Sequence, residues 1–306
     1  MKMFDWAVHL DPDFTPNVET SEGYLDIDTM TFYGGEEKVR FRNFTRARFL
    51  ENEGYPDSVM ITSRLNSSQR VMQLLMAIDA VRQAGGVPSI FIPYFPYARQ
   101  DRVCNAGESF SAKVMTTLIN DAFVDHVYIY DPHSDIVPSL LDNVRVIRNY
   151  SFIQSVVRNM LELKDILPVD KIALVVPDEG AHKKMAALAR NIHWTGNVVE
   201  CQKLRKMSTG EIIDQRVINP EAADGKYCLI VDDIIDGGRT FLGLADKLTE
   251  AGSKGNFLAC SHGIFSHGFK ELTSKFTRIY TTESFKTHDL TGLTDKVHVY
   301  PIALEE

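Results

Sequence analysis

The chain has 306 residues, of which 44% are hydrophobic and 24% are charged, and its formal net charge is −8. That length suits two medium-sized α/β domains or one large domain. The acidic balance argues against general binding to nucleic acid or to a membrane surface, and no apolar stretch reaches the length of a membrane span.

Apolar, β-rich runs alternate along the chain with segments of helical apolar spacing. The predicted strands are 58–61, 88–92, 126–130, 171–176, 197–201, 227–231, 256–261 and 278–281. The predicted helices between them are 67–83, 111–123, 150–162 and 181–190. This alternation predicts an α/β fold of mostly parallel sheets covered by helices on both faces. The expected domain boundary near Asn149 separates residues 1–149 from residues 150–306.

Polar residues follow three of the predicted strands. They are Asp131-Pro-His133, Pro177-Asp178-Glu179 and the pair Asp232-Asp233. In open α/β sheets ligands bind beyond the carboxyl ends of the strands. We therefore expect these side chains to face clefts.

The segment 227–241 carries the most informative motif. Its apolar run ends in two adjacent carboxylates, a turn reading Asp236-Gly237-Gly238-Arg239-Thr240 follows, and helical spacing continues over 241–251. Carboxylates accept hydrogen bonds from ribose hydroxyls, and the loop N–H groups with the positive end of a helix hold phosphate. The motif resembles the phosphoribosyl diphosphate loop of the phosphoribosyltransferase fold. An ordinary βα turn with a surface Asp pair is the alternative.

A second cluster of polar residues lies at the end of the segment 93–102. Arg99, Gln100, Asp101 and Arg102 follow a stiff turn of aromatic and proline residues. Arginine can grip phosphate with two hydrogen bonds, and Gln or Asp can read a base edge or a ribose. By itself the segment also fits a solvated charged loop.

Taken together, the motifs resemble the ribose-phosphate diphosphokinase (phosphoribosyl pyrophosphate synthetase) family. Residues 93–102 reproduce the family's Pro-Tyr-x-x-Tyr-Ala-Arg-Gln-Asp-Arg/Lys. The other matches are Phe32-Tyr-Gly-Gly35-Glu36, Ser111-Ala-Lys113, Asp131-Pro-His133, Pro177-Asp178 with Gly180 and Lys183, and Lys203-Leu-Arg205 followed by Thr209-Gly-Glu211. The resemblance implies two phosphoribosyltransferase-like domains. It also implies transfer of the diphosphate of ATP to the anomeric hydroxyl of ribose 5-phosphate, giving phosphoribosyl diphosphate and AMP.

The resemblance also implies a role for each cluster, with ATP as co-substrate and Mg²⁺ as cofactor. The nucleotide-binding residues are Phe32, Glu36, Arg99, Gln100 and Asp101, the first two from a neighbouring subunit of a homo-oligomer, a dimer or a hexamer. The sugar-phosphate residues are Asp232, Asp233, Asp236, Gly237, Gly238, Arg239 and Thr240. His133 and Asp178 are the expected metal ligands, and Lys203, Arg205 and His133 the expected catalytic residues.

Two departures from the family pattern lie in the sugar-phosphate loop. Gly237 lacks the hydroxyl of the family's threonine, and Arg239 stands where the family has glycine. This open, cationic loop is compatible with ADP-ribose as the acceptor, a second hypothesis. A third hypothesis is a catalytically silent regulatory binding subunit, against which the presence of Lys203 and Arg205 argues.

The four cysteines are far apart and form no CxxC pair, and the N-terminus lacks the layout of a signal peptide. We therefore expect reduced cysteines in a cytoplasmic protein without membrane or nucleic-acid partners.

Overall fold

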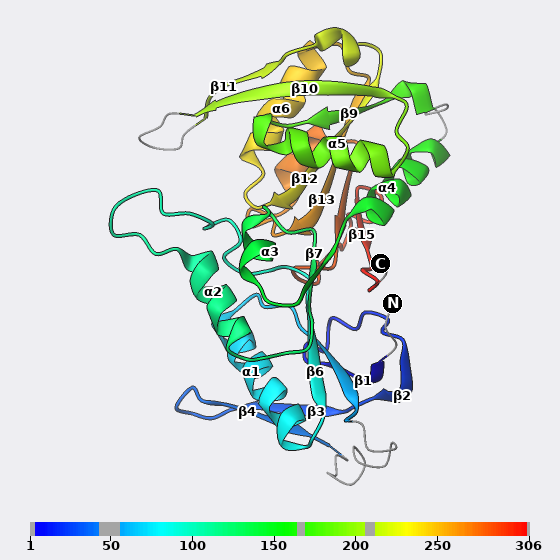
Figure 1. Ribbon diagram of the computed structural model, residues 1–306. Helices are drawn as coiled ribbons and strands as arrows, with labels where there is room; N and C mark the ends of the chain where they lie inside the picture. Colours follow the sequence, from blue (N-terminus) through cyan, green and yellow to red (C-terminus); the bar gives the residue numbers. More distant parts are fainter. Residues whose placement is uncertain (1–3, 43–55, 164–168, 206–211, 305–306) are drawn as a thin grey trace. The chain divides into compact units, whose positions relative to one another are not determined.

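The structure is a computed structural model that describes residues 4–42, 56–163, 169–205 and 212–304. The chain forms two compact units (Figure 1). Unit 1 comprises residues 1–148, 284–287 and 301–306, and unit 2 comprises residues 149–283 and 288–300. Among the described residues, no helix combines the length and the apolar character that a bilayer crossing requires.

Unit 1 is built on a six-stranded parallel sheet of order β2-β1-β5-β6-β7-β8. Its strands are β1 (Phe4–His9), β2 (Thr20–Tyr24), β5 (Ser58–Thr62), β6 (Val87–Ile92), β7 (Val127–Tyr130) and β8 (Val144–Ile147). Its helices are α1 (Ser68–Gln83), α2 (Ser111–Asn120) and α3 (Ile136–Leu140). β3 (Ile27–Thr31) and β4 (Glu37–Phe41) form a separate antiparallel hairpin, and β4 packs against α1.

The two faces of this sheet are covered differently. One face packs against α1 and α2 through residues such as Leu74 and Ile119. The opposite face packs against Phe14 after β1 and against Ile302 and Leu304 near the C-terminus. Among the described residues of unit 1, the helices pack on one face of the sheet, and chain segments distant in sequence bury the second apolar face.

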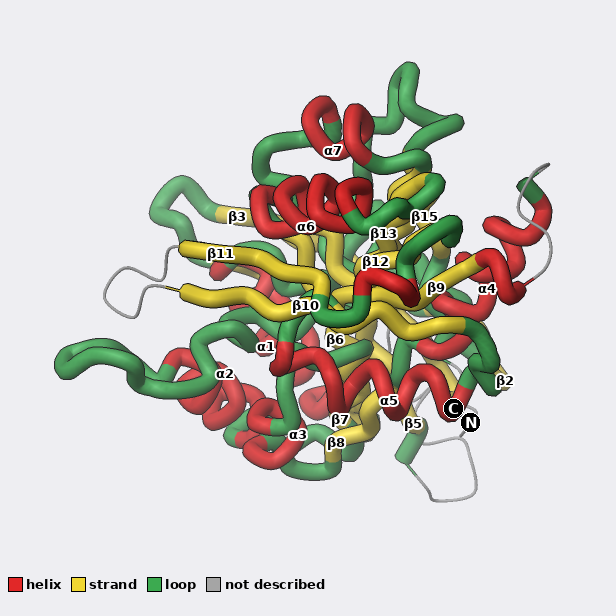
Figure 2. Tube along the Cα trace, turned by 90° about the horizontal axis from the view of Figure 1, so that it is seen from above, coloured by secondary structure: helices red, strands yellow, loops and turns green. Residues whose placement is uncertain are grey.

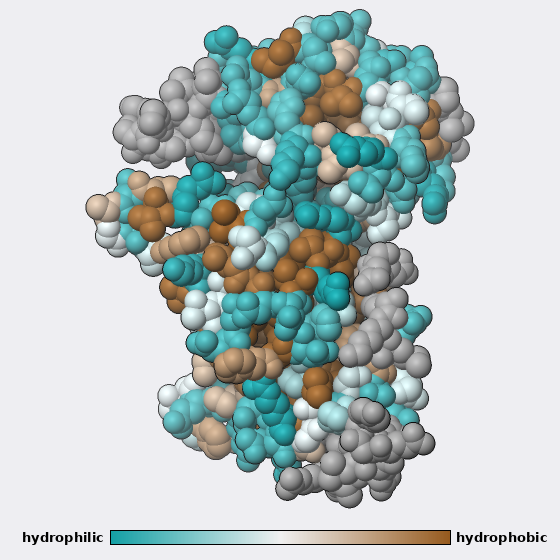
Figure 3. Space-filling view, in the orientation of Figure 1, coloured by the Kyte–Doolittle hydropathy of each residue, from teal (hydrophilic) through white to brown (hydrophobic). Residues whose placement is uncertain are grey.

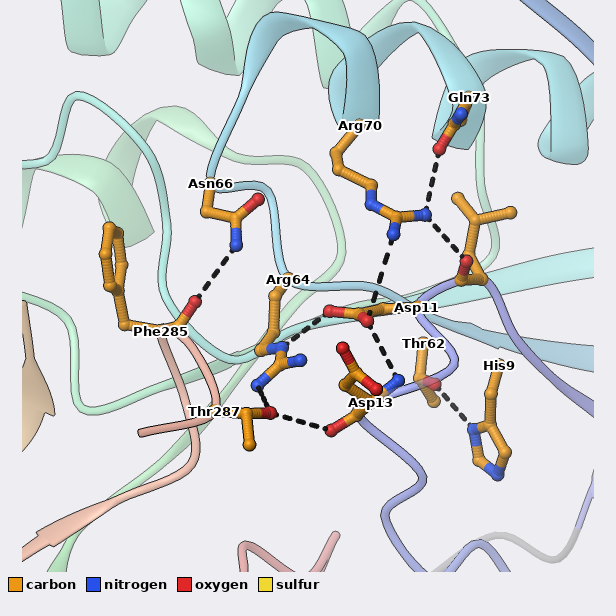
Figure 4. A network of polar contacts seen from close by, with 11 residues as sticks. His9, Asp11, Asp13, Thr62, Arg64, Asn66, Arg70, Gln73, Phe285 and Thr287 are labelled. Carbon is orange, nitrogen blue, oxygen red and sulfur yellow. Dashed lines mark hydrogen bonds and ion pairs between the residues drawn. The ribbon is translucent and has the colours of Figure 1, made fainter. Parts of the chain in front are cut away.

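A buried polar network ties the segment 284–287 into unit 1 (Figure 4). Arg64 Nε donates to Asp11 Oδ2 at 2.6 Å, and Arg64 Nη1 donates to Thr287 Oγ1 at 3.2 Å. Arg70 Nη2 lies 3.9 Å from Asp11 Oδ1. Because the Arg64 and Asp11 side chains are only 3% and 5% exposed, removing either partner would strand a buried charge.

Unit 2 is built on a seven-stranded sheet of order β11-β10-β9-β12-β13-β14-β15, in which every pairing is parallel except β10 with β11. Its strands are β9 (Ile172–Val176), β10 (Asn197–Arg205), β11 (Ile212–Val217), β12 (Tyr227–Ile235), β13 (Gly255–Gly263), β14 (Arg278–Thr282) and β15 (Val297–Tyr300). Its helices are α4 (Tyr150–Glu162), α5 (His182–Asn191), α6 (Arg239–Glu250) and α7 (Lys270–Lys275), with short 3₁₀ turns at Val169–Lys171, Glu179–Ala181 and Pro220–Ala222.

Helices cover both faces of the sheet in unit 2. The apolar residues of α6 and α7, among them Leu244 and Leu272, form the core on one face. Those of α4 and α5, among them Ile153 and Leu188, form the core on the other. Figure 2 shows the two helix pairs on opposite sides of the strands. The predicted α/β class is thus confirmed.

The predicted elements differ from the structure mainly at their ends. The helix predicted over 150–162 matches α4, whereas the strand predicted to end at residue 231 continues to Ile235. Pairing explains the extension, since β13 remains hydrogen-bonded to β12 as far as Ile235 opposite Gly263. The sequence also failed to predict several strands, namely β1, β2, β3, β8, β11 and β15. Of these, β2, β8, β11 and β15 lie at sheet edges and β3 belongs to the two-stranded hairpin, whereas β1 lies inside the sheet of unit 1.

Candidate active site

A short strand between two longer ones shapes the carboxyl edge of the sheet in unit 2. β9 pairs with β12 only as far as Val175 opposite Ile230, and with β10 only as far as Val176 opposite Glu200. β10 and β12 continue five residues further, to Arg205 and Ile235. The chain that leaves β9 therefore passes between side chains carried by the extensions of its two neighbours.

Asp178 lies in this position and contacts β10. It is the N-cap of the 3₁₀ turn Glu179–Ala181, and its Oδ1 accepts from the Ala181 N–H at 3.2 Å. Lys203 Nζ donates to its Oδ2 at 2.8 Å, and the Lys203 side chain is only 10% exposed. The structure thus joins a proposed metal ligand to a proposed catalytic cation twenty-five residues away.

The two adjacent carboxylates lie inside β12, on the stretch that β9 leaves unpaired. The expectation that the strand ends before them is therefore wrong. Asp233 is 7% exposed, and its N–H donates to Asp232 Oδ1 at 2.9 Å. Burial first, and then the charge of Asp233, raises the pKa of the Asp232 carboxyl well above its ordinary value, with a further contribution from Asp178. A strongly shifted pKa on a residue that lines a pocket marks a candidate functional site.

A small pocket of unit 2 opens onto this carboxylate pair. Asp232 and Asp233 line it together with Asn149, Ala181 and Lys184, and apolar side chains of α5 complete the wall. For Asp232 and Asp233, the expectation that the strand-end carboxylates face a cleft therefore agrees with the structure.

The glycine-rich turn leads directly into α6, which begins at Arg239. Gly238 is the N-cap with φ +80°, and a Cβ there would lie 3.0 Å from Leu272 Cδ2, so both backbone and packing require glycine. The first N–H groups of a helix lack intrahelical acceptors and carry the positive end of the helix dipole. The side chain of Arg239 is exposed, while Thr240 and Asp236 are half-buried. This geometry is suited to an anionic group.

A histidine that the sequence did not indicate lies against this turn. The ring of His267, in the loop between β13 and α7, comes within 3.3 Å of the place that a Cβ on Gly237 would occupy. The two residues are thirty positions apart, and no spacing rule connects them, so only the tertiary structure reveals the contact.

In unit 1, the predicted nucleotide residues lie beyond the end of β6. Arg99 and Gln100 are exposed, whereas Asp101 is buried. Burial opposes ionisation of Asp101, but hydrogen bonds from Arg102 and Ser134 outweigh it, and the pKa of Asp101 is lowered.

His133 also belongs to unit 1 and follows β7. Its side chain is exposed, and its charge helps to lower the pKa of Asp101. The structure therefore brings the predicted residues Asp101 and His133 close enough to interact electrostatically. Ser134, which follows His133 in the chain, donates a hydrogen bond to Asp101.

Phe32 and Glu36 lie at the tip of the β3–β4 hairpin. The Phe32 N–H donates to the Glu36 carbonyl at 2.8 Å, and 46% of the Phe32 side chain is exposed. The strand residue that directly follows the tip is fixed to α1, because Gln73 Nε2 donates to Glu37 Oε2 at 2.7 Å. The hairpin therefore presents an exposed aromatic residue next to an anchored one.

Part of the predicted catalytic loop lies outside the described residues. The backbone of Arg205 pairs with Ile212 of β11, and its side chain is not among those described. The segment Thr209-Gly-Glu211 lies wholly outside them.

The donor set in unit 2 suits a cation that shares its coordination with substrate. Within the described ranges, no group of three or more His, Cys, Asp or Glu side chains is arranged to hold a metal ion. Mg²⁺ commonly binds through one or two carboxylates, with water and substrate phosphates completing the shell. Asp178 and the Asp232–Asp233 pair supply such carboxylates, and both Asp233 and Asp178 raise the pKa of Asp232.

Comparison with known proteins identifies the family. Residues 26–122 match the N-terminal domain of ribose phosphate pyrophosphokinase. The chain is 30% identical over 257 residues to a ribose-phosphate pyrophosphokinase of Bradyrhizobium diazoefficiens, covering 83% of this chain and 78% of that protein. It is 29% identical over 262 residues to that of Thermococcus kodakarensis, covering 82% of each. The phosphoribosylpyrophosphate synthetase of Mycobacterium smegmatis shares the fold, with a TM-score of 0.77 at 21% identity over 97% of this chain and 94% of that one. The chain therefore belongs to the ribose-phosphate pyrophosphokinase family.

Proposed function

We propose that the protein transfers the β,γ-diphosphate of ATP to the anomeric hydroxyl of ribose 5-phosphate, in a magnesium-dependent reaction that yields phosphoribosyl diphosphate and AMP. Membership of the family carries this proposal. In unit 2, an acidic pair, a glycine turn at a helix N-terminus and a lysine–aspartate contact support it.

The acceptor binds to unit 2. Asp232 and Asp233 accept hydrogen bonds from the ribose hydroxyls, and protonation of one carboxyl of the pair reduces the repulsion between them. The turn from Asp236 to Thr240 holds the 5′-phosphate, because the N–H groups at the start of α6 point outward and Arg239 is exposed beside them.

Lys203 and Arg205 stabilise the charge that develops as the diphosphate separates from AMP. The anomeric oxygen forms a bond to the β-phosphorus while the bond from that phosphorus to the α–β bridging oxygen breaks. Such transfer depends on positioning and on cationic side chains rather than on a protein nucleophile. The contact of Lys203 with Asp178 holds the ammonium group at the carboxyl edge of the sheet before substrate arrives.

The nucleotide binds to residues of unit 1. Arg99 and Gln100 are exposed beyond the end of β6, where they can contact phosphate and base, and Asp101 is ionised beside them. Phe32 and Glu36 contact the adenine bound to a neighbouring subunit, since the hairpin tip exposes an aromatic residue and the adjacent Glu37 is anchored to α1.

Asp178 is the proposed magnesium ligand of unit 2, and His133, acting directly or through water, is the proposed metal ligand of unit 1. A hard cation prefers oxygen, so Asp178 is the better donor, and Lys203 shares its carboxylate. When bound, the ion neutralises charge on the diphosphate and orients it.

Homo-oligomer formation, as a dimer or a hexamer, is supported by exposed apolar side chains on unit 1. They are Tyr33, Met72, Met76, Val114 and Leu118 on the hairpin, α1 and α2. Brown apolar atoms are visible among teal polar ones on the surface of these helices in Figure 3. Cytoplasmic location is supported by three buried free thiols, at Cys201, Cys228 and Cys260, which suit a reducing compartment.

ADP-ribose is a second candidate acceptor. Gly237 carries no side chain, and Arg239 adds an exposed cation at the first position of α6, where a second phosphate would meet it. A diphosphate would use this cation more fully than a single phosphate would.

The deciding experiment measures AMP release from Mg-ATP by chromatography with ribose 5-phosphate, with ADP-ribose and without acceptor. We expect AMP release that depends on ribose 5-phosphate, with the diphosphorylated product identified by ³¹P NMR. Release with ADP-ribose alone would replace the first candidate by the second. A folded protein that releases AMP with neither acceptor would instead support a silent regulatory subunit.

A further inference from the structure

The loop between β13 and α7 is docked on the sugar-phosphate turn. The N–H groups of Ile264 and Phe265 donate to the Ile235 carbonyl at 2.8 and 3.2 Å, and the Ser266 N–H donates to the Asp236 carbonyl at 3.2 Å. These three bonds fix the backbone that immediately precedes His267. These main-chain contacts therefore hold the imidazole beside the turn.

The imidazole fills the space that a side chain at position 237 would need. A Cβ on Gly237 would lie 3.3 Å from His267 Cε1, 3.4 Å from Nδ1 and 3.9 Å from Nε2. Gly237 has no left-handed φ, so the backbone would accept a side chain, and the ring is what competes for the space. The His267 ring thus lies where a side chain at position 237 would otherwise be accommodated.

The polar edge of this ring is available to a ligand. His267 is exposed, and within the described residues its ring takes part in no hydrogen bond or ion pair. An imidazole carries at least one N–H donor in either protonation state. A donor next to Gly237 adds a side-chain group to the backbone N–H groups at the start of α6, and hydrogen bonds to an anionic oxygen are the strong ones.

We propose that His267 binds the 5′-phosphoryl group of the acceptor, supplying from the β13–α7 loop the side-chain donor that Gly237 does not. The inference rests on the proposed function, because that function assigns the phosphoryl group to this turn. His267 contacts substrate away from the reacting anomeric oxygen, so it determines acceptor affinity and not the rate of the chemical step.

The test compares His267→Ala with Ser266→Ala, a control in the same exposed loop whose backbone bond is retained. We expect His267→Ala to raise the KM for ribose 5-phosphate about ten- to a hundredfold, the range for a hydrogen bond to a charged group. The turnover number should change less than about threefold, and Ser266→Ala should match the parent. Because His267 is exposed, the thermal unfolding of the variant should also match the parent. A KM for His267→Ala within twofold of the parent value would overturn the proposal.

A residue swap tests the spatial part of the inference. Gly237→Thr alone places its Cβ against the ring and should also raise the KM. The double variant Gly237→Thr/His267→Ala gives the threonine hydroxyl the vacated space, so its KM should be lower than that of either single variant. A double variant no better than His267→Ala would contradict the claim that the ring takes the place of a side chain at 237.

Calorimetry with ribose 5-phosphate separates failure of this inference from failure of the proposed function. If the parent binds ribose 5-phosphate without releasing AMP, the function is wrong, while weaker binding by His267→Ala still supports the inference. If the parent turns over and the variant matches it, only the inference fails. A parent that neither binds nor turns over ribose 5-phosphate refutes both.

Discussion

Replacing Lys203 by alanine tests the proposed charge stabilisation. The Nζ–Oδ2 distance to Asp178 is 2.8 Å, with 10% of the Lys203 and 32% of the Asp178 side chain exposed. Because solvent reaches the carboxylate, the pair should contribute only about 1 kcal/mol to stability. Loss of a donor to developing charge costs about a hundred- to a thousandfold in turnover, or about 2.7–4 kcal/mol. We therefore expect a catalytic loss much larger than the stability loss.

The assay for Lys203→Ala combines steady-state AMP release with calorimetric ATP binding and thermal unfolding. Turnover should fall at least about a hundredfold, with the dissociation constant for ATP changed less than about threefold. The melting temperature should fall by about 2–4 °C, as about 1 kcal/mol implies for a unit of this size. Lys247→Ala is the control, because it removes an ion pair of 2.7 Å to Glu250 on the exposed surface of α6.

Two results would refute this reasoning. Parental turnover in Lys203→Ala would show that the ammonium group does not act in catalysis. A turnover loss matched by an equal loss of ATP affinity would show that Lys203 binds the ground state and the transition state alike.

Three further predictions concern unit 2. Gly238→Ala should lower the free energy of unfolding by about 2 kcal/mol in chemical denaturation, because it forces a side chain into a left-handed backbone 3.0 Å from Leu272. Equal denaturation midpoints for Gly237→Ala and Gly238→Ala would contradict this prediction. Asp232→Asn should raise stability at neutral pH and abolish most activity. The folded-state pKa of Asp232 is raised, so the parent loses stability as pH rises from the unfolded value through the folded one, and the advantage of the variant should vanish in acid. An advantage independent of pH would refute the raised pKa. Arg239→Gly should leave the KM for ribose 5-phosphate within a few-fold of the parent value. If ADP-ribose is the acceptor, the same substitution should raise the KM for ADP-ribose about ten- to a hundredfold. Equal effects on the two KM values would show that Arg239 contacts only one phosphate.

The unit 2 turn illustrates how much of the site could be read from the sequence. Its glycines and the helical spacing after it indicated a helix N-terminus, and α6 begins at Arg239 within the predicted turn. The carboxylate pair was found by its place after an apolar run. The position of the pair inside β12 could not be predicted, because the end of a strand depends on how far its neighbour continues to pair. Local sequence does not encode the length of β13.

The sequence by itself determined the α/β class, the helix Tyr150–Glu162 and the residue types that a sugar phosphate requires, because hydrophobic periodicity and glycine placement are local properties. Only the tertiary structure decided which of these residues meet. The contact of Lys203 with Asp178 follows from a short β9 between longer neighbours, and that of His267 with Gly237 from a loop anchored to Ile235. Both join residues twenty-five or more positions apart, and strand register sets such distances.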